Sequence, residues 1–121
     1  MRAESTEQIA FMDRVRWLRP RLVPFVFAVP NGGPRGKRAA TTLKREGVLP
    51  GVPDLIVALP RGQHHGLMIE LKRSDGGRTS DEQLELHGLY RAQGYRVEVC
   101  AGAESAWATF TEYVDGREAA Q

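Results

Sequence analysis

The stretch "GVPDLIVALPRGQHHGLMIELKR", from Gly51 to Arg73, contains two apolar runs separated by a polar turn. Short β-rich runs joined by a glycine-containing turn are typical of two strands that form a hairpin. The first run begins with the carboxylate of Asp54, and the second ends with Glu70 and Lys72. The sequence therefore predicts a hairpin that carries three charged side chains toward one end.

The spacing of the three charges places them on one face of this hairpin. Side chains alternate along a strand, so Glu70 and Lys72 point one way while Leu71 points the other. A hairpin that folds symmetrically about Gln63 puts Asp54 opposite Lys72 and one diagonal step from Glu70. A register slip of one residue would separate the charges, so the interpretation depends on this pairing.

Two carboxylates and a lysine that converge in this way have a definite chemical use. Carboxylate oxygens suit Mg²⁺ or Mn²⁺, and such an ion polarises a phosphodiester and lowers the pKa of an attacking water. The lysine would orient that water or stabilise charge on the phosphate. The alternative is a turn residue, Asp54, beside an exposed Glu70–Lys72 ion pair. Apolar flanking residues favour a covered strand, where charges need compensation, but spacing alone leaves both interpretations open.

Patterning along the rest of the chain predicts an α/β protein. A small mixed sheet with helices on its faces is expected, and the strand after the crossover helix should pair in parallel with an earlier strand. One domain over residues 1–121 is expected, with a core of about residues 4–114 and a frayed tail over 115–121. The other predicted elements are a helix over Glu4–Leu18, a strand over Val23–Val29, a brief helix over Lys37–Arg45, a helix capped by Thr79 or Ser80 that runs to about Gln93, a strand over Tyr95–Cys100 and a helix over Ala103–Tyr113.

The first predicted helix carries two acidic residues near its start. A stripe with helical spacing puts Glu4 on the line that faces the core, and Glu7 lies on the shoulder of that stripe, about 60° away. Aromatic residues at helical spacing are expected in the core or in an interface. The stripe comprises Glu4, Gln8, Phe11, Val15 and Leu18, and the aromatic residues are Trp17, Trp107, Phe110 and Tyr113.

The amino-acid composition is that of a globular protein without a membrane-spanning segment. With 41% apolar and 26% charged residues, the chain is typical of a globular protein. No apolar stretch approaches the roughly 20 residues of a membrane span, and no apolar signal core opens the sequence, so a cytoplasmic protein is expected. The only cysteine, Cys100, excludes an intrachain disulfide and is expected to be a small core or edge residue.

Positive charge is concentrated in the first half of the chain. Residues 1–50 contain ten Lys or Arg against four Asp or Glu, whereas residues 51–121 contain seven against eleven. A locally basic half is compatible with a polyanionic partner such as nucleic acid, and equally with a solvated basic surface. Within it, Arg35, Lys37 and Arg38 in a Gly/Pro-rich turn are candidate phosphate contacts, with an ordinary solvated turn as the alternative.

Several short motifs together resemble a known nuclease family. Pro53-Asp54 followed by "ELK" at Glu70–Lys72 resembles the PD-(D/E)XK nuclease signature. With "EQIA" near the start, "PNGG" at Pro30–Gly33, "GVPDLIV", "IELK" and Gln83, the sequence is similar to the virus-type replication-repair nuclease family, VRR-NUC. The resemblance runs from about Glu4 to Val114. It implies a restriction-endonuclease-like core, a small mixed β-sheet flanked by helices.

The resemblance also implies an activity. It implies a Mg²⁺- or Mn²⁺-dependent endonuclease for branched DNA such as Holliday junctions, and a homodimer as in stand-alone phage-encoded members, in the cytoplasm of a bacterial or phage-infected cell. A flap, end or single-strand nuclease of the same fold, or a DNA-binding module that does not cleave, are alternatives. The implied site residues are Asp54, Glu70 and the backbone carbonyl of Leu71 as metal ligands, Lys72 as the catalytic lysine, Gln83 as the glutamine after the signature, and Glu4, preferred to Glu7, as the helix carboxylate.

Overall fold

The predicted hairpin lies at the centre of a four-stranded sheet. The computed structural model describes residues 4–30 and 40–116. Strands β2 (Leu55–Val57) and β3 (Leu67–Lys72) pair antiparallel, and the sheet order is β1-β2-β3-β4. Strand β1 (Val26–Ala28) pairs antiparallel with β2, while β4 (Arg96–Ala101) pairs in parallel with β3, as expected for a strand that follows a crossover helix.

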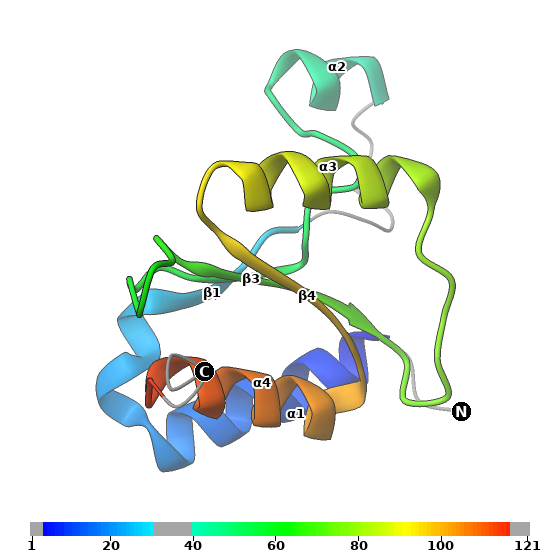
Figure 1. The fold of residues 1–121 in the computed structure, drawn as a ribbon. Helices are drawn as coiled ribbons and strands as arrows, with labels where there is room; N and C mark the ends of the chain where they lie inside the picture. The colour runs from blue at the N-terminus through cyan, green and yellow to red at the C-terminus, as the bar shows by residue number, and fades with distance from the viewer. Residues whose placement is uncertain (1–3, 31–39, 117–121) are drawn as a thin grey trace.

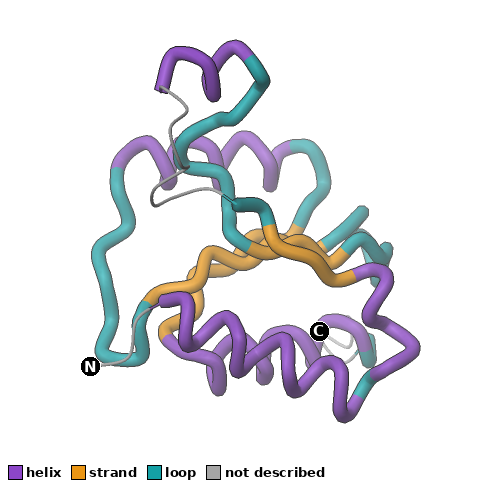
Figure 2. Tube along the Cα trace, turned by 180° about the vertical axis from the view of Figure 1, so that it is seen from behind, coloured by secondary structure: helices purple, strands orange, loops and turns teal. Residues whose placement is uncertain are grey.

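Helices cover both faces of this sheet. In Figure 1, α3 (Asp81–Ala92) lies over one face with α2 (Ala40–Arg45) beyond it, while α1 (Glu4–Leu18) and α4 (Gly102–Val114) lie under the other. The view from behind in Figure 2 shows the same layers. The fold class predicted from the sequence, a small mixed sheet flanked by helices, is confirmed. Among the described residues, no helix combines the length and apolar character needed to cross a membrane.

The hydrophobic core lies between the sheet and the α1–α4 layer. Side chains at odd-numbered positions of β2 and β3 point into this layer, where the rings of Phe11 and Phe110 meet edge to face with centroids 5.6 Å apart. Cys100 is buried in the same core, as predicted. The central members of the core are Phe11, Val15, Leu55, Val57, Leu67, Ile69, Leu71, Ala106, Phe110 and Tyr113.

The strand predicted over Val23–Val29 is shorter than expected. A 3₁₀ helix, η1, occupies Pro20–Phe25, and only Val26–Ala28 forms a strand. Pro24 lies inside the predicted strand, where a proline cannot donate a ladder hydrogen bond, and its fixed φ suits a tight helical turn. The apolar composition of the run therefore misled the prediction for its first half.

The hairpin register differs from the predicted one by two residues. Leu55 pairs with Ile69, so continuing the ladder by one step places Asp54 opposite Glu70, with Lys72 one diagonal step away. Arg61 and His64 close the tip with two backbone hydrogen bonds of 3.0 and 2.9 Å, which centres the turn between Gly62 and Gln63. Between this closing pair and the Val57–Leu67 pair, the chain has three residues on one side, 58–60, and two on the other, 65–66. The extra residue moves the strand pairing by one more position. Because a shift of two preserves the face, the predicted convergence of the charges survives.

The core-facing stripe of α1 is also displaced from the predicted one. Glu7, Phe11 and Val15 are the buried residues of the helix, whereas Glu4 is exposed. The prediction that Glu4 faces the core is therefore wrong. Trp17 is 83% exposed and does not belong to the core, unlike Phe110 and Tyr113.

Candidate active site

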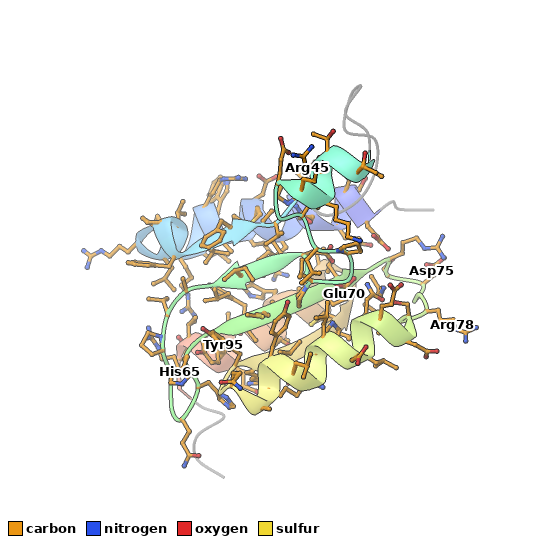
Figure 3. All side chains as sticks on the ribbon, turned by 90° about the horizontal axis from the view of Figure 1, so that it is seen from above. Arg45, His65, Glu70, Asp75, Arg78 and Tyr95 are labelled. Carbon is orange, nitrogen blue, oxygen red and sulfur yellow. The ribbon has the colours of Figure 1, made fainter. Side chains whose placement is uncertain are left out.

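Asp54, Glu70 and Lys72 converge at one end of the sheet, on the face that α3 covers. Asp54 immediately precedes β2, and its Oδ2 accepts a 2.7 Å hydrogen bond from the backbone N–H of Leu71 in β3. Glu70 and Lys72 are only 4% and 7% exposed. In Figure 3, Glu70 lies at the opposite end of the sheet from His65 and Tyr95. Because the lysine and Glu70 are buried, an exposed surface ion pair does not describe this cluster.

Gln83 links the two charged residues of β3. Its side-chain Nε2 donates a 2.8 Å hydrogen bond to Oε2 of Glu70, and Nζ of Lys72 lies 3.3 Å from both Gln83 Oε1 and that same Oε2. Gln83 also closes the capping box of α3: its backbone N–H donates to Ser80 Oγ, and Ser80 N–H donates to Gln83 Oε1. The sequence allowed both roles for this glutamine, and the structure combines them.

The surroundings of both carboxyl groups disfavour their charged forms, and the charge of Asp54 adds to this effect at Glu70. Burial and the nearby charge of Asp54 raise the pKa of Glu70 to about 7, although Lys72 opposes the shift. The pKa of Asp54 is also raised, mainly by burial and to a smaller extent by the charge of Glu4, against the hydrogen bond from Leu71 N–H. One oxygen of Glu70, Oε1, is buried without a hydrogen-bond partner. Part of the compensation for these charges comes from Lys72, whose Nζ lies 3.3 Å from Oε2 of Glu70.

The donor set fits a magnesium-type ion better than a transition metal. Nowhere in residues 4–30 and 40–116 do three His, Cys, Asp or Glu side chains gather as a metal site. Mg²⁺ needs only one or two protein carboxylates, since it keeps several waters and accepts phosphate oxygens. Asp54 and Glu70, with the free Oε1 of Glu70, satisfy that requirement, and the backbone of Leu71 lies between Glu70 and Lys72.

The two acidic residues of α1 have different surroundings. Glu7 is buried, and its Oε1 accepts a 3.0 Å hydrogen bond from the backbone N–H of Ala103 in the first turn of α4. An acidic group at this position satisfies a helix N-terminus that has no side-chain cap of its own. Glu4 stays exposed, yet its charge contributes to the raised pKa of Asp54. Glu7 thus has a structural partner, while Glu4 is the α1 carboxylate whose charge raises the pKa of Asp54.

A histidine that sequence reasoning did not single out lies beside the cluster. His87 is fully buried, and neither ring nitrogen has a hydrogen-bond partner. Burial first, and then the positive charges of Arg91 and Lys72, lower the pKa of His87, so the imidazole is held neutral. It follows Gln83 by one helical turn, and this four-residue spacing on the sheet-facing side of α3 is the signal that could have identified it.

The loop between β3 and α3 packs against the lysine. A Cβ atom placed on Gly77 would lie 3.3 Å from Cδ of Lys72, so any larger residue would crowd the aliphatic stem of the lysine. The close approach explains why a glycine occupies this position. The loop thereby restricts the rotamers that are open to Lys72.

The predicted phosphate contacts Arg35, Lys37 and Arg38 lie outside the described residues. Among the residues that are described, Arg45 of α2 and Arg78 of the β3–α3 loop are exposed, and in Figure 3 Glu70 lies between them. In this view, cationic side chains therefore accompany the acidic cluster.

Fold and site together define the class of this protein. A mixed sheet flanked by helices, with a Pro-Asp before one central strand and Glu-x-Lys at the end of the next, is the arrangement of PD-(D/E)XK-type proteins. A family model for the VRR-NUC domain matches residues 7–104. The chain belongs to the VRR-NUC family, which is a family of nucleases.

A solved structure supports this assignment. The chain is similar to a protein described as a "VRR_NUC domain protein", with a TM-score of 0.83 and 25% sequence identity over 96% of this chain and 91% of that one. None of the curated proteins matches the sequence.

Proposed function

We propose that this protein is a Mg²⁺- or Mn²⁺-dependent endonuclease that hydrolyses phosphodiester bonds in branched DNA, such as Holliday junctions. The observation that carries the proposal is the pair of half-buried Asp54 and buried Glu70, in which both pKa values are raised and Oε1 of Glu70 is buried without a hydrogen-bond partner. A divalent cation bound there would compensate both charges. A carboxylate pair buried for stability alone would be expected to have its oxygens hydrogen-bonded.

Asp54, Glu70, Leu71 and Lys72 would have different roles in this reaction. Asp54, Glu70 and the backbone carbonyl of Leu71 would hold the ion, and the chemistry it supplies when bound is polarisation of the phosphodiester and a lower pKa for the attacking water. Lys72 has three ammonium protons, of which two point toward Gln83 and Glu70. The third is available to orient that water or to donate to the phosphate as negative charge grows on it.

Two further residues support this chemistry. Gln83 holds Glu70 and Lys72 at a fixed separation, because it hydrogen-bonds both. Glu4 adds negative charge near Asp54, which would strengthen the attraction of the site for a cation. Both are positioning residues in this scheme.

DNA would be bound mainly through the basic first half of the chain. Arg35, Lys37 and Arg38 are the proposed phosphate contacts, joined by the exposed Arg45 and Arg78, between which Glu70 lies in Figure 3. Contacts to phosphates position a duplex without reading its sequence, as a structure-selective nuclease requires. We place this reaction in the cytoplasm of a bacterial or phage-infected cell.

A homodimer would present two such sites to a branched substrate. Large apolar side chains remain exposed on α1 and β1, where Ile9 is 58%, Trp17 83% and Phe27 48% exposed. Strand β1 is also an edge of the sheet that the described residues form, and an edge strand can pair with another chain. Symmetric cleavage of a junction needs two active sites related by a two-fold axis, and this surface is the proposed contact between the two copies.

The deciding experiment is cleavage of a labelled substrate panel. A four-way junction, a 5′ flap, a splayed arm and plain duplex would be incubated with wild-type protein and with Asp54→Asn, in the presence of Mg²⁺, Mn²⁺ or a chelator. Metal-dependent cutting of the junction by the wild type alone is expected. Preferential cutting of flaps or single strands would make the alternative nuclease correct, whereas tight binding without cutting would identify a DNA-binding module.

A further inference from the structure

An apolar cleft of about 500 Å³ lies on the same face of the sheet as the candidate active site. Its floor is made by Ile56 of β2 and Met68 of β3, Tyr90 of α3 forms part of its wall, and the loop from α2 to β2 contributes Leu49 and Pro53. Of the described residues that line it, Glu46 alone is charged. This volume and apolar lining are typical of a small-ligand site.

The cleft lies next to the acidic cluster along the hairpin. Ile56 and Met68 are cross-strand partners, and the next pair on the same face along the hairpin is Asp54 with Glu70. Residues two apart on a strand are separated by roughly 6.5 Å, so the floor of the cleft and the two carboxylates are immediate neighbours. Pro53 joins the two regions, because it lines the cleft and precedes Asp54.

The residues that line the cleft suit an apolar aromatic group better than an anionic one. Among residues 4–30 and 40–116, no lysine or arginine lines the cleft, so this part of the lining offers no cation to a phosphate. A nucleobase instead has apolar faces and polar edges. A tyrosine ring can stack on such a face, and the apolar floor would take the ring out of water.

We propose that this cleft receives one unpaired base of the DNA, next to the phosphate bound at Asp54 and Glu70. The inference rests on the proposed nuclease function and deepens it, because it names the feature of the substrate that is recognised. A base in an intact duplex is stacked and paired and cannot reach the cleft, whereas a base at a branch point or mismatch enters at little cost. Cleavage would thereby be directed to sites where pairing is interrupted.

Equilibrium binding and fluorescence test this directly. The probe is a duplex with a single unpaired 2-aminopurine, compared with the same duplex fully paired. Wild-type protein should bind the unpaired probe more tightly and change its fluorescence. Loss of one base–aromatic stack corresponds to about a 5- to 150-fold loss of affinity, so Tyr90→Ala should reduce binding of the unpaired probe to the level of the paired duplex. Tyr90→Phe keeps the ring and should keep the preference.

Two more variants test whether an effect of Tyr90→Ala comes from the cleft itself rather than from misfolding. Leu49 is half exposed, so Leu49→Glu should fold normally while its added charge at the cleft opposes base entry and lowers the preference. Tyr95→Ala is the matched control, because the ring of Tyr95 packs on His65 and does not line the cleft, so its loss should leave the preference intact.

The outcomes separate this inference from the proposed function. Metal-dependent cleavage that favours neither probe, and that Tyr90→Ala does not alter, would overturn the base cleft and leave the nuclease standing. Absence of metal-dependent cleavage on every DNA would overturn the nuclease and the cleft with it. If Leu49→Glu instead converted a dimer to a monomer with the base preference unchanged, the cleft would be a protein interface and the inference would be wrong.

Discussion

Replacing Glu70 by glutamine should stabilise the metal-free protein at pH 8. In the folded protein the pKa of Glu70 is raised from 4.5 to about 7, so at pH 8 the carboxylate is charged in an environment that disfavours its charge. A pKa difference of one corresponds to about 1.36 kcal/mol, so this rise sets an upper limit of about 3 kcal/mol for the destabilisation. Glutamine keeps the shape and an oxygen that can accept from Gln83 Nε2, while it removes the charge.

The effect has a defined pH window. A carboxyl group whose pKa is raised on folding holds its proton more tightly in the folded state, so the stability of the metal-free wild type falls as pH rises from about 4.5 to about 7. At pH 5 most of the penalty is absent, and Glu70→Gln should gain less than about 1 kcal/mol there. At pH 8, with part of the gain offset because the amide of glutamine is itself a polar group that must be buried, about 1–2 kcal/mol is expected, or roughly 4–8 °C in Tm.

Thermal melts with and without Mg²⁺ provide the assay. Mg²⁺ should raise the Tm of the wild type at pH 8, more strongly than at pH 6 because it competes with the proton, and should have little effect on Glu70→Gln. The exposed Glu85→Gln serves as the control and should stay within about 0.5 kcal/mol of wild type. If Glu70→Gln lowered the Tm at pH 8 without metal, or if Mg²⁺ stabilised both proteins equally, Glu70 would be part of an ordinary ion pair and the reasoning would be refuted.

Three further predictions concern other parts of the site. Lys72→Ala should abolish cleavage while Mg²⁺ titration still shows binding, since the lysine acts on the water and phosphate; a variant that cuts at the wild-type rate would contradict the mechanism. Joint replacement of Arg35, Lys37 and Arg38 by alanine should weaken binding to all duplexes alike, and the slope of log affinity against log salt should become shallower by about 0.9 per lost phosphate contact; an unchanged slope would indicate a solvated turn. Glu7→Ala should destabilise the protein by about 1–3 kcal/mol in urea melts, with Mg²⁺ affinity unchanged, because its hydrogen bond caps a helix; loss of Mg²⁺ binding with normal stability would reassign it to the metal site.

The convergence of the charges was predictable because it depends only on whether residue numbers are even or odd. Glu70 and Lys72 share a face in any strand, and Asp54 lies on the same face whenever even-numbered residues of the two strands face each other. The two-residue error in the hairpin register therefore changed which residue faces Asp54 and left the three charges together. The capping box of Ser80 and Gln83 was equally readable, since it is set by local spacing.

The errors arose where distant contacts decide the outcome. Glu7 is buried because the N-terminus of α4, nearly a hundred residues later, needs an acceptor, and the periodicity of α1 contains no trace of that need. The shortened β1 was signalled by Pro24, whose effect was outweighed by the apolar composition around it. His87 carries no motif, and its relation to Lys72 exists only once α3 has packed on the sheet.

One side-chain oxygen of Gln83 accepts two hydrogen bonds, so the position of Lys72 depends on whether the first turn of α3 is formed. Oε1 of Gln83 accepts from the backbone N–H of Ser80 and from Nζ of Lys72. Helix ends fray more readily than helix centres, so the first turn of α3 opens more often than the molecule as a whole unfolds. Each opening removes Gln83 as a partner of Lys72 and leaves the lysine with Glu70 alone. Amide hydrogen exchange at the start of α3 would then measure how often the contact between Gln83 and Lys72 is broken.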